Sequence, residues 1–182
     1  MSKNKLSSKS GQALVELTLM FPLMILLLFG VVEVSRVISV YHSLVHLTRE
    51  GANLTSRGTE VNKSLTAVIT ATKPTLRDEN KQQWKVIYSQ LRQEPGKPCP
   101  PKPCTYQVDS QVEVGDLKEP SAVGAVKKPV SIAGMDDVEP NQIFHSIEVF
   151  YDYKPDVFSF VGKFINPKFY ERTIYTNIGA IP

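Results

Sequence analysis

The sequence predicts an α+β fold: a long N-terminal helix, its inner half transmembrane, followed by a small antiparallel-sheet outer domain. Three observations predict it. Of the 13 prolines, only Pro22 precedes Pro74, so the first third of the chain can form long helix and the remainder cannot. Residues 13–32 form one apolar run, and later segments alternate polar and apolar residues as strands do. A chain of 182 residues suits one domain with an appendage.

The apolar run reads "ALVELTLMFPLMILLLFGVV" and is interrupted only by Glu16, Thr18 and Pro22. At about 1.5 Å of rise per residue it covers about 30 Å, the thickness of the hydrocarbon core of a bilayer. We therefore expect a transmembrane segment over about 13–34. A cleaved secretory signal peptide is the alternative. No A-x-A cleavage pattern follows the run, however, and the run is longer than a usual signal-peptide core.

The flanks of the run predict its orientation. A leader of residues 1–11 carries Lys3, Lys5 and Lys9 and no acidic residue, which favours a cytoplasmic N-terminus. The C-terminal part is then periplasmic or extracytoplasmic. The whole chain has 21 basic and 18 acidic residues, so without the three leader lysines the two signs balance. Because no Lys/Arg-rich run remains, nucleic acid is excluded as an expected partner.

Helical periodicity continues beyond the apolar run. Apolar residues recur at three- and four-residue spacing up to a stop at Gly58, which predicts one helix over 12–57. His42, His46 and Glu50 are spaced by four residues on this helix, so they could hold a metal on one face. A polar stripe at the membrane exit explains them as well and is favoured, so no metal site is predicted.

The remaining residues, 58–182, predict the outer domain. Residues 115–141 are rich in Gly and Pro and suggest a long exposed loop, with His145 beyond it on a strand surface. The apolar, aromatic stretch 155–167 suggests a short helix or a lip that packs on a partner. The expected regular elements are a helix over 61–72 and four strands, 84–92, 105–114, 144–154 and 169–179.

Two cysteines lie between the first two expected strands. Cys99 and Cys104 flank a proline-rich stretch and could close a small disulfide ring that pins the hairpin, which requires an oxidising compartment. Free thiols are the alternative. Half of a zinc site is a weaker one, because no second Cys/His pair completes four ligands.

Catalytic motifs are missing from the sequence. It contains no phosphate-binding loop, nucleophile elbow, zinc-protease helix or dinucleotide fingerprint. We therefore predict that the protein is not an enzyme, and we expect neither a cofactor nor a small-molecule substrate.

The start of the apolar run carries a resemblance. Gly11, four intervening residues and then Glu16 resemble the processing site of type IV prepilins. In that family a membrane-embedded prepilin peptidase cuts after the Gly on the cytoplasmic side. The resemblance implies a cleaved leader of residues 1–11, Gln12 as the new N-terminus and Glu16 as the fifth mature residue.

Residues 11–58 as a whole resemble the TadE/TadG-like minor pilins, or pseudopilins, of the tight-adherence (Tad/Flp) pilus system. The matching parts are the G-x-A-x-V-E start, Phe21-Pro22, the second acid Glu33, and "REGA" at residues 49–52. The segment "IEVFYDYKP" and the aromatic stretch after it are compatible with the outer domain of that family.

The resemblance implies a structural or assembly component of a Tad-type pilus that supports adhesion and surface colonisation. Its implied partners are the prepilin peptidase, other pilin subunits, the assembly platform and inner-membrane lipid. Glu16 would pair with the new α-ammonium group of Gln12 on a neighbouring subunit, and Pro22 would kink the helix. The alternatives are an uncleaved single-span anchor that scaffolds an envelope or secretion complex, and a secreted binding domain that begins near residue 35.

Overall fold

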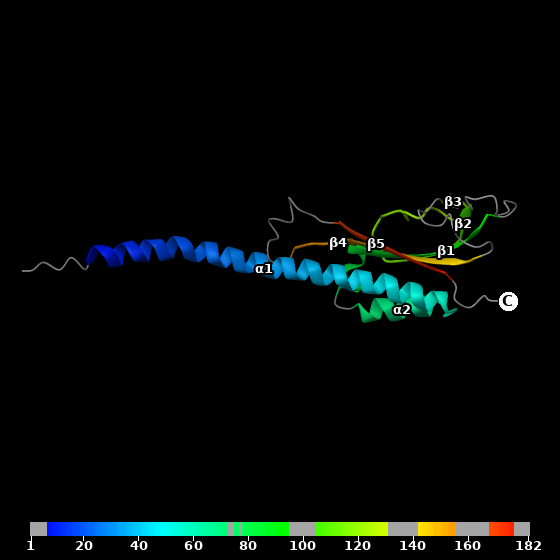
Figure 1. The fold of residues 1–182 in the computed structure, drawn as a ribbon, viewed down its shortest axis with the longest axis horizontal. Coiled ribbons are helices and arrows are strands. Elements are labelled where there is room, and N and C mark those ends of the chain that lie inside the picture. The colour runs from blue at the N-terminus through cyan, green and yellow to red at the C-terminus, as the bar shows by residue number, and fades with distance from the viewer. Residues whose placement is uncertain are drawn as a thin grey trace, which may run out of the picture.

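The computed structural model describes residues 7–72, 75–76, 78–94, 105–130, 142–155 and 168–176. Helix α1 (Ser7–Ser56) is 50 residues long, and Pro22 lies inside it. The described strands and α2 pack beside its second half, and the first half projects away from them (Figure 1). The predicted architecture of a long helix and a small sheet domain is confirmed.

A turn at Gly58, whose positive φ of 81° suits glycine, leads into α2 (Val61–Ala71). A 3-10 helix, η1 (Asp78–Gln83), leads into the sheet. Among the described residues the sheet has five strands in the order β3-β2-β1-β4-β5, and all neighbouring strands are antiparallel. Four of them match the expected strands, and the fifth is short. The strands are β1 (Trp84–Gln93), β2 (Tyr106–Val114), β3 (Pro129–Val130), β4 (Phe144–Asp152) and β5 (Lys168–Thr176).

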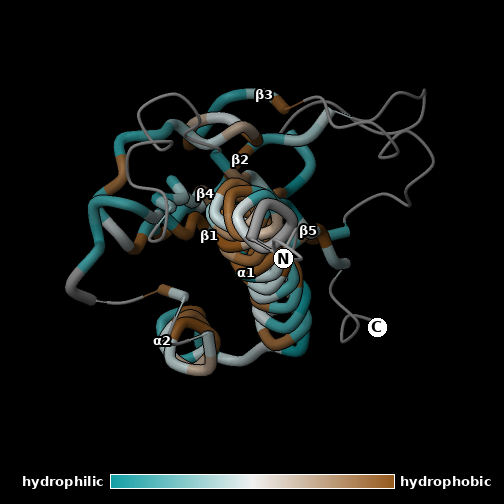
Figure 2. The backbone as a smooth tube through the Cα atoms, turned by 90° about the vertical axis from the view of Figure 1, so that its left-hand side faces the viewer, coloured by the Kyte–Doolittle hydropathy of each residue, from teal (hydrophilic) through white to brown (hydrophobic). Residues whose placement is uncertain are grey.

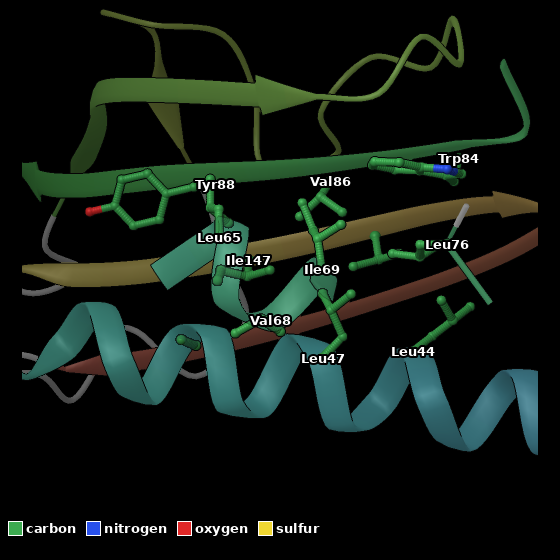
Figure 3. Packing of buried hydrophobic residues seen from close by; sticks show 12 residues of the cluster. Leu44, Leu47, Leu65, Val68, Ile69, Leu76, Trp84, Val86, Tyr88 and Ile147 are labelled. Carbon is green, nitrogen blue, oxygen red and sulfur yellow. The ribbon is translucent and has the colours of Figure 1, made fainter. Parts of the chain in front are cut away.

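One face of the sheet packs on both helices, which Figure 2 shows nearly end-on beneath it. Alternate residues of β1 and β4 point to this face because side chains along a strand alternate between the two sides of a sheet. Cross-strand pairs such as Val86 with Val149 and Tyr88 with Ile147 bring the two central strands together. Figure 3 shows the resulting apolar core, to which α1 and α2 contribute Leu44, Leu47, Leu65, Val68 and Ile69.

The end of β2 is fixed by a glycine. Gly115 has a φ of 99°, in the left-handed region, and a Cβ atom there would lie 2.4 Å from the carbonyl oxygen of Trp84. The ring of Trp84 is also within 3.0 Å of that position. Only glycine fits this approach between β2 and the start of β1.

The chain that follows β2 is a largely irregular loop over residues 115–128, as predicted, and many of its residues are exposed, but part of it packs on the second face of the sheet. Val123 is buried there and packs against Leu91, Tyr106, Val108 and Phe144. The carboxylate of Glu148, which is fully buried, fastens this segment to β4. It accepts hydrogen bonds from the backbone N–H groups of Ala122 and Val123, at 3.0 and 3.2 Å, and from the hydroxyl of Ser121. Residues 131–141 lie outside the described residues.

A second strand, β5, adds a donor to the Glu148 carboxylate. The hydroxyl of Tyr170 on β5 donates to Glu148 Oε1 at 2.9 Å. Burial raises the pKa of Tyr170, and the charge of the adjacent Glu148 carboxylate and the hydrogen bond to it raise that pKa further. A buried carboxylate is costly unless it is hydrogen-bonded, and here backbone and hydroxyl donors supply those bonds. The covering segment, β4 and β5 are therefore held at one point.

His145 does not lie on a strand surface, which corrects the prediction. It is 7% exposed and lies on β4, paired across the sheet with Gln90 of β1 and Tyr175 of β5. Its Nδ1 atom is 2.8 Å from the hydroxyl of Tyr88. Burial lowers the pKa of His145 and raises the pKa of Tyr88 to about 12, so both groups are neutral near pH 7.

Candidate membrane and assembly site

The first half of α1 presents an exposed apolar surface. Of the helices in the described part of the chain, one is long and apolar enough to cross a membrane, and it covers Gly11–Ser56. None of the eighteen residues in its most apolar stretch is buried inside the protein. Most of the large apolar side chains from Leu14 to Val34 are exposed, and their exposed fractions run from 46% to 72%. A surface of this kind needs lipid or other apolar helices around it.

The predicted processing residues lie in the first turns of α1. Gly11 has open space around it, with no heavy atom within 4 Å of the position that a Cβ atom would take. Gln12 and Glu16 are brought together, because the side-chain amide of Gln12 donates to Glu16 Oε1 at 3.1 Å. Both are exposed, one helical turn apart on one face. Glu16 therefore has a neutral local donor in this structure.

Pro22 lies inside α1, where the helix continues on both sides of it. Proline has no N–H to donate to the carbonyl of Thr18, so one helical hydrogen bond is missing there. The hydroxyl of Thr18 bonds in turn to the carbonyl of Leu14 at 2.7 Å. This local weakening of the backbone falls within the apolar half.

The junction between the two halves of α1 is marked by Glu33. The hydroxyl of Tyr153, in the segment after β4, donates to Glu33 Oε1 at 2.5 Å. Tyr153 is 6% exposed, and its ring packs against Phe169, which in turn contacts Tyr41 on α1. The sheet domain is therefore fastened to the helix at the first residue beyond the apolar run.

The REGA segment, residues 49–52, lies where α1 meets α2 and β4. A Cβ atom on Gly51 would lie 2.5 Å from the δ-methyl of Ile147 and 3.8 Å from Val68. Ala52 is fully buried, whereas Arg49 and Glu50 are exposed. The small residues of this segment thus allow the helix to approach the sheet closely.

His42, His46 and Glu50 form one wall of a groove between α1 and α2. The groove has a volume of about 540 Å³, and Ala67 and Ala71 of α2 line its other side. In the described ranges, no group of three or more His, Cys, Asp or Glu residues is arranged so that it could hold a metal ion. The three side chains line the groove together with apolar residues such as Leu47 and Val68 and with the hydroxyl residues Ser39, Ser43 and Thr72.

Some predicted features lie outside the described residues. Cys99 and Cys104 fall in the gap between β1 and β2, so their disulfide stays a prediction. Most of the aromatic stretch 155–167 falls in the gap between β4 and β5.

Comparison with known proteins gives a match within helix α1. A family model described as TadE-like protein matches residues 11–53. This N-terminal segment is TadE-like. The match runs from Gly11 through the apolar half, Glu33 and the REGA segment, and it associates the chain with Tad pilus systems. Searches of curated proteins and of solved structures found no match.

The TadE-like segment also makes a contact that sequence reasoning missed. Glu33 stands out in the sequence as an acid at the end of the apolar run, but nothing near it indicates Tyr153 as its partner. The two are 120 residues apart, and no local pattern pairs them. The Y-D-Y motif at the end of β4 is the available signal, since a tyrosine hydroxyl that becomes buried needs a hydrogen-bond partner.

Proposed function

We propose that the protein is a minor pilin-like, or pseudopilin, component of Tad/Flp-type pilus biogenesis, with a structural role that supports adhesion and surface colonisation. The observation that carries the proposal is the TadE-like match, because it begins at Gly11 and includes Glu16. The exposed apolar half of α1 supports it, since such a helix suits first a bilayer and then the helical packing of a fibre. The role is structural rather than catalytic.

The proposal assigns a place to each part of the chain. Residues 1–11 are a cytoplasmic leader that the prepilin peptidase removes, and residues 12–57 are the helix, spanning the inner membrane over about 13–34. Residues 58–182 form the periplasmic or extracytoplasmic domain. Other pilin subunits and the assembly platform are the protein partners. The lysine-bearing leader supports this orientation.

Cleavage gives Glu16 its role in this proposal. Cutting after Gly11 converts the backbone amide nitrogen of Gln12 into an α-ammonium group. A carboxylate within the edge of a bilayer is costly unless it is paired, and the ammonium of a neighbouring subunit pairs it. Before cleavage, Glu16 has the side-chain amide of Gln12 as a weaker, neutral donor at 3.1 Å. Processing and assembly are coupled in this way.

The test of processing is the mass of the protein extracted from the membrane of a Tad-positive bacterium. We expect a chain that starts at Gln12. Intact mass is preferred to Edman sequencing because an N-terminal glutamine can cyclise and block the Edman reaction. A chain that starts only at Met1 would instead favour the alternative, an uncleaved anchor that scaffolds an envelope or secretion complex.

The test of Glu16 uses a matched pair of variants. We expect Glu16→Gln to be processed normally yet to be lost from sheared pili. Glu60→Gln removes a carboxylate that is exposed beyond α1 and ion-paired with Lys63, and it should enter pili as the native chain does. Normal incorporation of Glu16→Gln would contradict the charge-pairing role.

A further inference from the structure

We propose that the end of the sheet domain nearest the apolar half of α1 is seated in the lipid headgroup layer. The contact surface, here called the membrane-facing end, consists of the exposed Lys154 after β4, with the exposed Tyr41 of α1 just above it; the buried Tyr153 and the half-buried Phe169 lie behind them. The inference rests on the membrane span of the proposed function. It adds to that function a second lipid contact, made by the domain itself.

The sheet domain meets α1 next to the end of the apolar run. The apolar run ends at Val32 and the proposed span at about residue 34, and Tyr153 is hydrogen-bonded to Glu33 at this outer end of the span. A headgroup layer is about 5–7 Å thick on each side of the hydrocarbon core. Among the described residues, therefore, no stalk separates the sheet domain from the end of the apolar run. Figure 1 shows the end of β4 and the start of β5 at the side of the domain that faces the projecting half of α1.

The depth of the neighbouring residues follows from the helical rise. Tyr41 is eight residues beyond Glu33, so it lies about 12 Å further along the helix. Its ring is 6.4 Å from that of Phe169, and the ring of Phe169 is 6.1 Å from that of Tyr153. The aromatic chain thus extends from the headgroup level to just above it.

The chemistry of this end suits the headgroup region. Tyrosine is enriched at membrane surfaces because one end of its ring is apolar and its hydroxyl is polar. Tyr41 is 44% exposed and Lys154 is exposed, whereas Tyr153 is held inward by Glu33. An exposed lysine at this level can reach lipid phosphates with its ammonium group.

The experiment uses the full chain in liposomes and reads the depth of a single tryptophan. The native Trp84 is replaced by Phe, and tryptophan is placed in turn at Lys154, at Leu26 in the apolar run, or at Lys63 on α2. Lys63 is the matched control because its exposed side chain follows the far end of α1. The quenchers are a nitroxide carried on the lipid headgroup and bromine carried deep in the acyl chain.

We expect the headgroup nitroxide to quench Lys154→Trp severalfold more than Lys63→Trp, and deep bromine to quench Leu26→Trp. Equal, weak quenching at Lys154 and Lys63, with Leu26→Trp still quenched by deep bromine, would overturn the inference and leave the span intact. Absence of deep quenching at Leu26 would overturn the span itself. If Trp84→Phe fails to fold, the same three substitutions in the native chain give this comparison as differences from the Trp84 signal.

Discussion

The two halves of α1 are one continuous helix in opposite surroundings. In the first half, up to Val32, large apolar side chains are exposed all around the helix. In the second half a single stripe, from Glu33 through Val40 and Leu44 to Thr55, faces the domain while the opposite side stays exposed. Continuous apolarity suits a partner that surrounds the helix, and a stripe suits a partner on one side. The sequence pattern of each half therefore indicates the kind of surroundings that the half requires.

The largest expected difference in stability comes from making the same Leu→Ala substitution in each half of α1. Leu44→Ala removes a fully buried side chain from the core, so the free energy of unfolding of the domain should fall by about 2–5 kcal/mol. Leu26→Ala removes a side chain that is 55% exposed, so it should leave that free energy unchanged. Denaturant unfolding in detergent micelles, followed by Trp84 fluorescence, measures both. Equal losses would contradict the division of the helix.

The sequence predicts the helices and strands of this protein better than it predicts the contacts between them. Periodicity is a local property, so the helix, the short helix after it and four strands can be read from the sequence. The contacts that position the site join distant residues. Glu33 meets Tyr153, and the segment around Val123 folds over Glu148 although its Gly and Pro content suggests an exposed loop. No local pattern records such pairings, and the requirement for a small residue at Gly51 depends on the position of Ile147.

Two glycines of α1 also distinguish its two halves. Gly51→Ala places a Cβ atom 2.5 Å from the δ-methyl of the fully buried Ile147. Overpacking of this kind costs about 1–3 kcal/mol, from which the better helix propensity of alanine recovers up to about 1 kcal/mol. Gly30→Ala has no atom within 4 Å of its new Cβ and should not destabilise the domain. The same unfolding measurement compares them, and a destabilised Gly30→Ala protein would show that the first half is packed after all.

Lowering the pH should destabilise the sheet domain, which packs on the second half of α1, through protonation of His145. Burial lowers its folded-state pKa, so the unfolded chain binds the proton more readily. Stability is then fully present above the unfolded value of about 6.5 and falls as pH drops from there toward the folded pKa, by at most about 1.4 kcal/mol per pH unit. Unfolding titrations should show this slope in the native chain and not in His145→Gln. His42→Gln, at an exposed histidine of α1, should keep it; a slope that survives in His145→Gln would assign it to another group.

The smallest expected effect lies at the boundary between the halves. Tyr153→Phe removes the hydrogen bond to Glu33 and keeps the ring packed on Phe169, so the free energy of unfolding should fall by about 0.5–1.5 kcal/mol. Tyr175→Phe, near the far end of β5, is the matched control and should change it less. The orientation of the domain is the more telling readout. A domain held at Glu33 cannot swing freely about the end of the apolar run, so releasing it should broaden the range of depths sampled by a tryptophan at Lys154. Identical quenching at Lys154 with and without the Tyr153 hydroxyl would mean that packing along the stripe alone fixes the domain on the helix.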